Sequence, residues 1–533
     1  MSPRSSGCCR WRWNGSEPRG PGGGAVKGRA PGPALANVPL LTLMIGACGL
    51  LMLIPAAHAF LQGHGRIGSA FLYSGLVFML LGGLLALAQA RPRRQSALTG
   101  LFPLLGAIFL VLPAIMAVPL AEAMPTMRFV DAWFEMISSF TTTGASVIDT
   151  PRRVPQTIHL WRAMAGWLGG LFMLAAATAL LAPIGLGGFE LLRPPAEHPL
   201  ASDRAGAQTR QTAAPRFMAH LRQILPLYAG LTGLLWALLS VSGMAGFPAA
   251  VVAMSVLSTS GILPREALGP VGYAAEAAIF VFFFVALSRA FLPAGSMRAL
   301  PALRADPQPR MALALIGAVT ALVVLRHWLG GFQPVEGETL PALGYAAWGA
   351  AFTGLSFLTT TGIVNDAWIT GRAWSGLQPP GLVLMALALM GGGVATTAGG
   401  VKLLRVYALA RMGSDELRRL IYPGAVRGGG ERARFLAGRG ARAAWLFVMV
   451  FAATACLLVG VLLALGMSFE NAIIFAAAAL TTTGQLAQYA GDSALYWSLV
   501  PDPARAVLAL GMILGRLEIL VMLALLSAQL ARE

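Results

Sequence analysis

Charged side chains are scarce in this chain of 533 residues. Only 11% of the residues are Asp, Glu, Lys or Arg, whereas 56% are hydrophobic. A soluble globular protein carries about 25% charged residues, so the composition excludes an ordinary soluble domain. Uncharged stretches such as 69–90, 97–121, 163–189 and 443–469 reach the roughly 20 residues that span a bilayer as a helix. The chain is therefore predicted to be an all-α multi-pass membrane protein.

Cysteine and histidine are also rare, with four and six copies in the whole chain. Cys8, Cys9, Cys48 and Cys456 do not have the spacing of a metal site, so reduced packing or tail thiols are the better interpretation. The apolar stretches contain neither an HExxH motif nor a Ser/His/Asp grouping. A multi-pass membrane enzyme is thus the less favoured alternative, and no covalently bound cofactor is expected.

Acidic residues are outnumbered, because 22 Asp and Glu stand against 39 Lys and Arg, giving a net charge of +17. With ten predicted spans and both termini inside, most of the Lys and Arg fall in cytoplasmic segments, and segment 402–442 holds the largest number, ten. This asymmetry follows the positive-inside rule. The expected partner is therefore the lipid bilayer and not nucleic acid. The predicted location is the cell membrane, which is the inner membrane in a Gram-negative bacterium.

Four short polar runs interrupt the apolar sequence. They are loop one (Thr141–Gly144), loop two (Ser258–Gly261), loop three (Thr359–Gly362) and loop four (Thr481–Gly484). Each run follows an apolar segment of 11 to 14 residues, namely 130–140, 247–257, 345–358 and 468–480. Helices of that length reach only about 16–21 Å, which is short of the roughly 30 Å hydrocarbon core. Each segment is therefore predicted to enter the membrane and turn back at its loop.

The spacing of the four loops predicts a repeated architecture of span, pore helix, filter loop and second span around one pore. Two additional spans precede the first repeat, which makes about ten transmembrane helices. The predicted units are a disordered basic tail (1–37), the two additional spans (38–96), and repeats one to four (97–222, 223–310, 311–442 and 443–533).

A ring of such loops can bind a cation. Threonine disfavours helix continuation, and glycine permits the positive φ that lets successive carbonyls point to one side. Rings of carbonyl oxygens replace the hydration shell of K⁺, and the helix C-termini favour a cation at the axis. The alternative is that each Thr-Gly run is an ordinary glycine cap. The predicted filter residues are Thr142, Thr143, Gly144, Thr259, Ser260, Gly261, Thr360, Thr361, Gly362, Thr482, Thr483 and Gly484. The predicted K⁺ ligands are the carbonyls of Thr143, Gly144, Ser260, Gly261, Thr361, Gly362, Thr483 and Gly484.

A gate is predicted below the filter. Segment Gly391–Gly400, called here the glycine segment, holds five glycines and two threonines inside the expected second span of repeat three, so that helix should be broken. Arg516 lies near the middle of the expected last span, 504–530, and either pairs with Glu276 or Glu470 or forms a barrier in the pore. Close helix packing is the alternative role for the glycines. The predicted gate residues are Gly391, Gly392, Gly393, Thr396, Thr397, Gly399, Gly400 and Arg516.

Four motifs resemble those of the Trk/Ktr/HKT superfamily of potassium transporters. They read DAWFEMISSFTTTGAS at 131–146, WLGG at 167–170, GGGVATTAGGVK at 391–402 and GRLE at 515–518. The match covers about residues 38–531, and the two additional spans suggest the Trk-like branch. It departs at 268–288, which lacks the double glycine, and at Gln485, where a Pro or Gly is expected nearby.

The resemblance implies potassium uptake, with K⁺ as substrate and Arg516 as a pore barrier. It also implies a homodimer seated on a nucleotide-binding regulatory subunit. A sodium-conducting member of the same superfamily is the alternative, although that branch tends to carry Ser in place of the first filter glycine, here Gly144. The sequence leaves open whether the chain is a channel or a coupled symporter.

Overall fold

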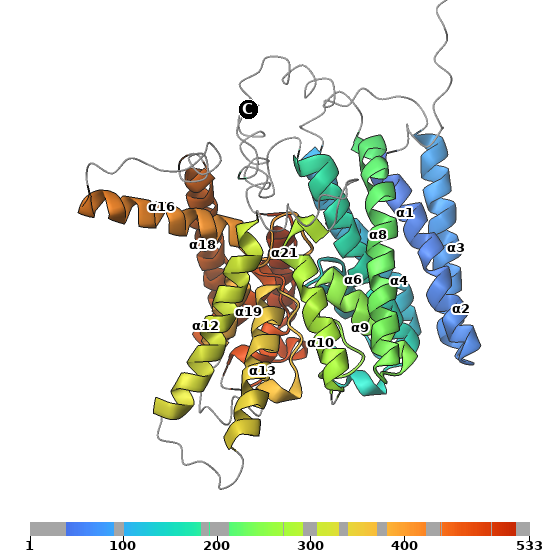
Figure 1. Ribbon diagram of the computed structural model, residues 1–533. Helices are drawn as coiled ribbons and strands as arrows, with labels where there is room; N and C mark the ends of the chain where they lie inside the picture. The colour runs from blue at the N-terminus through green and yellow to red at the C-terminus, as the bar shows by residue number, and fades with distance from the viewer. Residues whose placement is uncertain are drawn as a thin grey trace, which may run out of the picture.

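The computed structural model describes residues 39–89, 101–182, 191, 213–269, 271–291, 306–329, 339–369, 381–422, 438, 440–491 and 493–518. Within these ranges all regular structure is helical, as predicted (Figure 1). The predicted basic tail, 1–37, lies outside the described residues.

Seven long helical stretches in the described part of the chain are apolar enough to cross a membrane. They run roughly parallel in Figure 1. Their helices are α1 (Leu40–Leu51) continued by α2 (Leu53–Leu61), α3 (Gly65–Ala88), α4 (Leu101–Ala123), α6 (Gln156–Ala176), α8 (Ala213–Val241), α12 (Pro307–Leu329) and α18 (Ala441–Ala464). Many of their large apolar side chains are exposed, as expected for helices that face lipid.

Four shorter helices each end at one of the loops. They are α5 (Phe129–Phe140), α9 (Gly246–Ser258), α13 (Thr339–Leu358) and α19 (Phe469–Leu480). Three begin and end within one residue of the predicted bounds. The prediction was wrong for α13, which begins at Thr339 and not at Tyr345. Pro341 lies at the third position of this helix, where its missing N–H breaks no intrahelical bond.

The helices found where second spans were expected after loops two, three and four are shorter than a full span. They are α10 (Tyr273–Phe283), α15 (Gly381–Met390) and α21 (Asp502–Arg516). The expected last span, 504–530, is not continuous, because α21 ends at Arg516 and Glu518 adopts a left-handed φ of 55°. Residues 519–533 lie outside the described part of the chain.

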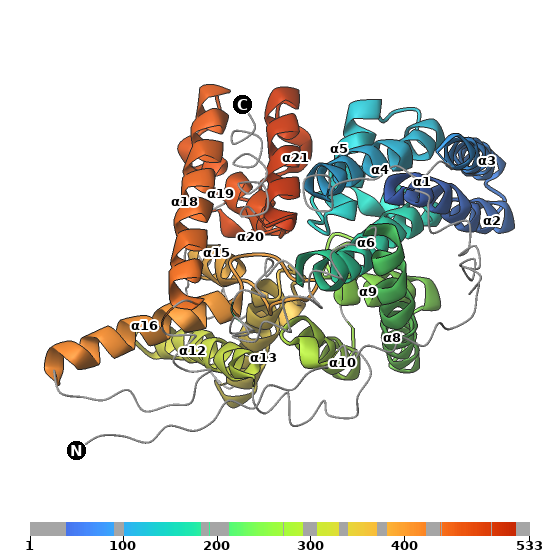
Figure 2. The same cartoon turned by 90° about the horizontal axis from the view of Figure 1, so that it is seen from above.

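Packing brings the first loop-bearing helix, α5, against α21 near the end of the described chain. Helix α5 contacts α4, α6 and α21, although α21 lies more than 360 residues away in the sequence (Figure 2). Helix α9 packs on α6 and α8. Helix α13 packs on α10, α12 and α15, and helix α19 packs on α18 and α21. The short helices therefore lie inside the assembly, and their loop ends are buried.

Two further helices flank this centre. Helix α20 (Leu486–Ala490) follows loop four directly and packs on α15 and α19. Helix α16 (Leu403–Ile421) begins after the glycine segment and lies across the long helices in Figure 1, against α12 and α18.

Candidate functional site

The second residue of each loop, a threonine in all four, has a left-handed backbone. The φ angles are 58° at Thr142, 56° at Thr259, 57° at Thr360 and 53° at Thr482. This conformation costs an L-residue about 1–2 kcal/mol. The same strained conformation at four corresponding positions indicates one local geometry repeated in the four loops and not a chance helix end.

Each left-handed threonine closes a Schellman cap. In loop one the N–H of Thr143 donates to the Ser138 carbonyl five residues earlier, at 2.8 Å, and the N–H of Thr142 donates to Ser139 at 2.9 Å. The first hydroxyl of each loop also donates to the carbonyl four residues earlier, as Thr141 does to Ile137 at 2.8 Å. The equivalent bonds in the other loops link Ser260 to Ser255, Thr361 to Ser356 and Thr483 to Ala478 at 2.9–3.0 Å. The runs therefore do cap their helices, and the left-handed position of each cap is a threonine and not the glycine.

The glycines that end the loops are in contact with the neighbouring loops. A Cβ added at Gly144 would collide with the carbonyl oxygen of Ser260, and one at Gly261 with that of Thr361. A Cβ at Gly362 would lie 2.9 Å from the Gln485 Cβ, and one at Gly484 would collide with the Ala145 backbone. The contacts run from loop one to two, two to three, three to four and four to one. The four loops thus form a closed ring.

Three of the four glycines have the predicted positive φ, with 71° at Gly144, 62° at Gly261 and 76° at Gly362. The prediction was wrong for Gly484, whose φ lies outside the left-handed region. The chain turns directly into α20 there, because Gln485 is already in the right-handed helical region with φ −64° and ψ −19°.

Both carbonyls that loop four was predicted to offer to K⁺ consequently accept hydrogen bonds from the protein itself. Thr483 O accepts the N–H of Leu486 at 3.0 Å, and Gly484 O accepts the Trp497 indole N–H at 3.1 Å. In loop one, Thr143 O is also engaged, because it accepts the N–H of Gly484 at 2.6 Å. Two glycine carbonyls of the other loops converge. Gly144 O and Gly261 O lie 3.4 Å and 3.0 Å from one atom, the Gln485 Nε2. Two backbone oxygens from different loops therefore face the same point.

The threonine hydroxyls form a second layer on the helix side of the glycines. Thr259 Oγ1 donates to Thr397 O at 2.8 Å, and Thr360 Oγ1 accepts the N–H of Gly399 at 2.7 Å. Thr142 Oγ1 and Thr482 Oγ1 are buried and have no hydrogen-bond partner among the described residues. This layer can offer two hydroxyl oxygens to a ligand.

The glycine segment lies directly beneath this layer and is not helical. It leaves α15 after Met390 and returns to α16 at Leu403, and its ends are joined by the bonds Val401 N–H to Leu389 O and Leu403 N–H to Gly392 O, both 2.9 Å. A Cβ at Gly393 would collide with Leu287 O, and one at Gly399 with Thr481 O. These glycines permit close contact between a buried loop and other buried backbone, and the segment that makes the contact is not a helix.

Arg516 reaches this segment. Its Nη1 donates to Thr397 O at 2.5 Å, and the side chain is buried. The alternative pairing with Glu276 or Glu470 was wrong, because no ion pair joins Arg516 to either carboxylate among the described residues, and its hydrogen bond goes to Thr397 O. Glu276 instead accepts hydrogen bonds from Trp348 and Asn365.

Other buried charges surround the returning end of the segment. Lys402 Nζ donates to Ala398 O, and Arg405 pairs with Glu518 at 2.6 Å. The Arg405 guanidinium also lies 3.8 Å from the centroid of the Phe447 ring. Glu518 therefore has an arginine partner of its own, other than Arg516.

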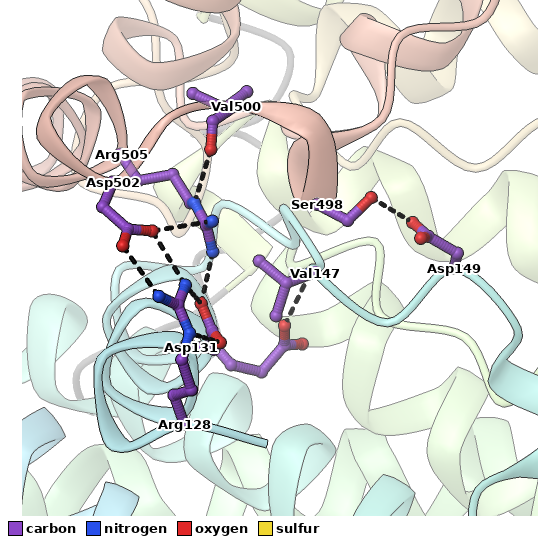
Figure 3. Close-up of polar contacts among 9 residues, drawn as sticks. Arg128, Asp131, Val147, Asp149, Ser498, Val500, Asp502 and Arg505 are labelled. Carbon is purple, nitrogen blue, oxygen red and sulfur yellow. Dashed lines mark hydrogen bonds and ion pairs between the residues drawn. The ribbon is translucent and has the colours of Figure 1, made fainter. Parts of the chain in front are cut away.

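A charge network joins the start of α5 to α21, at the end of α5 that is remote from loop one (Figure 3). Arg128 bridges Asp131 on α5 and Asp502 on α21, with N–O distances of 2.9 Å and 2.8 Å, and Arg505 contacts both carboxylates. Hydrogen bonds to Asp502 and Asp131 raise the pKa of Arg128 above its ordinary value. Deeper down, Glu135 pairs with Arg162 at 2.5 Å and accepts the N–H of Val147 at 2.9 Å. These contacts hold the segment after Gly144 in place.

Two glycines from the motifs noted in the sequence support the loop helices from behind. A Cβ at Gly169 would collide with the carbonyl of Phe140, the last residue of α5. A Cβ at Gly515 would collide with the carbonyl of Leu480, the last residue of α19. The close approach of α6 to the end of α5 and of α21 to the end of α19 therefore requires glycine at positions 169 and 515.

Sequence reasoning missed the left-handed threonines. A positive φ at threonine is disfavoured by its Cβ, so composition does not predict it. The sequence did mark these positions, because the second residue is threonine in all four loops, whereas the first and third residues are serine in loop two and threonine in the others. The partner of Arg516 also had no signature, since 119 residues separate it from Thr397.

Apolar helices, buried polar loops and a closed ring define this protein as a multi-pass membrane protein with a central polar site. The chain belongs to the TrkH family, described as cation transport protein, which matches residues 67–263 and 338–532. This family consists of transporters, and membership confirms the predicted superfamily and the prediction that the chain is not an enzyme.

Similar proteins cover nearly the whole chain. The Trk system potassium uptake protein TrkH of Salmonella typhimurium is 27% identical over 92% of this chain and 99% of its own length. The protein of the same name from Vibrio parahaemolyticus is 28% identical over 92% of this chain and 97% of its own. The crystal structure of the potassium transporter TrkH from Vibrio parahaemolyticus superimposes with a TM-score of 0.74 at 25% identity, covering 92% of this chain and 98% of that one.

Proposed function

We propose that this protein takes up potassium ions across the cell membrane through a filter formed by the four loops. The observation that carries the proposal is the closed ring, in which each loop glycine touches the next loop. The names of the similar proteins, which are potassium uptake proteins, agree with it. K⁺ is the transported substrate, and four repeats with about ten spans surround one pore.

The filter combines two kinds of oxygen. The carbonyls of Gly144 and Gly261 converge on one point, and the buried Thr142 and Thr482 hydroxyls have no protein partner among the described residues. Such oxygens replace the hydration shell of K⁺, and the C-terminal ends of the four short helices favour a cation there. Loops two and three supply the predicted carbonyl pairs. Loop one supplies the Gly144 carbonyl, because Thr143 O accepts the N–H of Gly484 at 2.6 Å, and loop four supplies the Thr482 hydroxyl at this conformation.

The glycine segment acts as the gate. It lies across the helix side of the filter, where its backbone is bonded to Thr259 and Thr360. Arg516 holds it there through Thr397 and places a positive charge below the filter. Conduction requires that this segment move, because non-helical backbone at this depth otherwise blocks the axis.

The protein also forms a homodimer that binds a cytoplasmic nucleotide-binding regulatory subunit, and both termini are cytoplasmic. Most Lys and Arg lie in the segments assigned to the cytoplasm, including α16, whose arginines include Arg411, Arg418 and Arg419. In a Gram-negative cell the membrane is the inner membrane.

The direct test is ⁸⁶Rb⁺ or K⁺ uptake by a host that lacks its own potassium uptake systems and expresses the full chain. Uptake and growth at low external K⁺ are expected. A well-expressed chain that gives no uptake would overturn the proposal. Uptake of ²²Na⁺ as fast as ⁸⁶Rb⁺ would favour the sodium-conducting alternative, to which the altered conformation of loop four gives some support.

A further inference from the structure

The side chain of Gln485 lies among the carbonyl oxygens of the filter. This residue follows Gly484 and is half-buried. Its Nε2 donates to Gly261 O at 3.0 Å and to Gly144 O at 3.4 Å. A primary amide has two hydrogens on one nitrogen, so each carbonyl can receive one of them.

The order of the ring determines where this side chain lies. Loop four touches loops three and one, and loop one touches loop two, so loops two and four face each other across the ring. A side chain from loop four that reaches Gly261 in loop two must therefore cross the axis. Its aliphatic part passes close to loop three, because a Cβ at Gly362 would lie 2.9 Å from the Gln485 Cβ.

We propose that the Gln485 amide is a tethered competitor of the cation at the glycine end of the filter. This inference rests on the proposed function. The oxygens that accept the two amide hydrogens are ones that a cation on the axis would use, and both cannot be bound at the same point at once. Cation entry at this level requires the side chain to leave, which three rotatable χ bonds allow. Gln485 thereby raises the ion concentration at which transport is half-saturated.

The local backbone holds the amide in this position. Loop four turns into α20 immediately after Gly484, and the turn is closed by Leu486 N–H to Thr483 O at 3.0 Å and Gln488 N–H to Gln485 O at 3.0 Å. The other three glycines adopt a positive φ, and no comparable side chain from their loops donates to a filter carbonyl among the described residues. The start of α20 directly after Gly484 therefore accounts both for the different φ of Gly484 and for the position of the Gln485 side chain.

The test compares three variants of the full chain in the potassium-uptake-deficient host. Gln485→Ala removes the side chain, and Gln485→Met keeps its length but has no hydrogen to donate. Gln488→Ala makes the same change one turn further along α20 and serves as the matched control. We expect both Gln485 variants to lower the half-saturating ⁸⁶Rb⁺ concentration about tenfold, because two neutral hydrogen bonds no longer oppose ion binding. The control should match the wild type.

A second readout measures binding without transport. Titrating K⁺ into the purified full-length protein should raise its thermal unfolding temperature, because K⁺ binds only the folded state. The half-effective K⁺ concentration should fall in Gln485→Ala and Gln485→Met and stay constant in Gln488→Ala. A role for Gln485 as a brace between loops predicts the opposite sign, with higher half-saturation and a lower unfolding temperature.

The outcomes separate the two proposals. If the wild type transports Rb⁺ but the Gln485 variants leave half-saturation unchanged or raise it, the competitor proposal is wrong and the proposed function stands. If neither the wild type nor any variant transports or is stabilised by K⁺, the proposed function fails, and this inference fails with it.

Discussion

Replacing Arg516 with alanine should open the pore. Arg516 Nη1 donates to Thr397 O in the middle of the glycine segment, and both groups are buried. A hydrogen bond from a charged group contributes about 1.5–3 kcal/mol, and each 1.4 kcal/mol is a factor of ten in an equilibrium. Loss of this bond should shift the segment from its blocking position by about 10–100-fold. Where the closed state dominates, flux should rise by about tenfold or more.

The surrounding charges make this variant a clean test. Glu518 stays paired with Arg405 at 2.6 Å, so removing Arg516 does not leave a buried carboxylate without a partner. Arg516→Lys is the matched control, because it keeps the positive charge below the filter. We expect the lysine variant to conduct nearly as little as the wild type.

Deleting Val394–Ala398 tests the same contact from the other side. The deletion removes Thr397, so it should raise flux by itself and make flux less dependent on a regulatory partner. Arg516→Ala should then add less in the deletion background than in the full chain, since the shared hydrogen bond is already lost. In the deletion background, Arg516→Ala removes only the repulsion between the positive charge of Arg516 and the ion.

The assay is ⁸⁶Rb⁺ flux into reconstituted vesicles, normalised to the amount of folded protein by size-exclusion chromatography. A well-folded Arg516→Ala variant with wild-type or lower flux would refute the role of Arg516 as a latch. Full additivity of Arg516→Ala and the deletion would show that the two do not act through Thr397.

Three further outcomes are expected. Gly144→Ser should weaken selectivity for K⁺ over Na⁺, because its Cβ would collide with Ser260 O. Gly230→Ser should leave selectivity unchanged, since a Cβ there meets nothing within 4 Å, and equal permeability ratios in the two variants would contradict the filter assignment. Glu135→Gln should lower the free energy of unfolding by about 3–5 kcal/mol, because it leaves Arg162 buried without its partner, and chemical denaturation that shows a loss below 1 kcal/mol would contradict this. Purification from the native source should yield a dimer together with a nucleotide-binding subunit, and a monomer with no partner would count against that assembly.

The sequence by itself determined the features that depend on local composition. Stretches of about 20 apolar residues indicate spans because the bilayer has a fixed thickness. The short segments before the loops were found because a helix has a fixed rise per residue, and α5, α9 and α19 begin and end within one residue of the predicted bounds. The glycine segment was predicted to be non-helical because five glycines weaken a helix wherever they occur.

Tertiary structure decided which groups meet. Gly484 follows three threonines as Gly144 and Gly362 do, yet its φ differs because α20 begins beside it and packs on α15 and α19. The left-handed threonines occur where helix ends are buried against other loops, and propensity alone opposes them. The contacts of Arg516 with Thr397 and of Gln485 with Gly261 join residues 119 and 224 positions apart. Such contacts depend on the closure of the ring, which no local pattern in the sequence specifies.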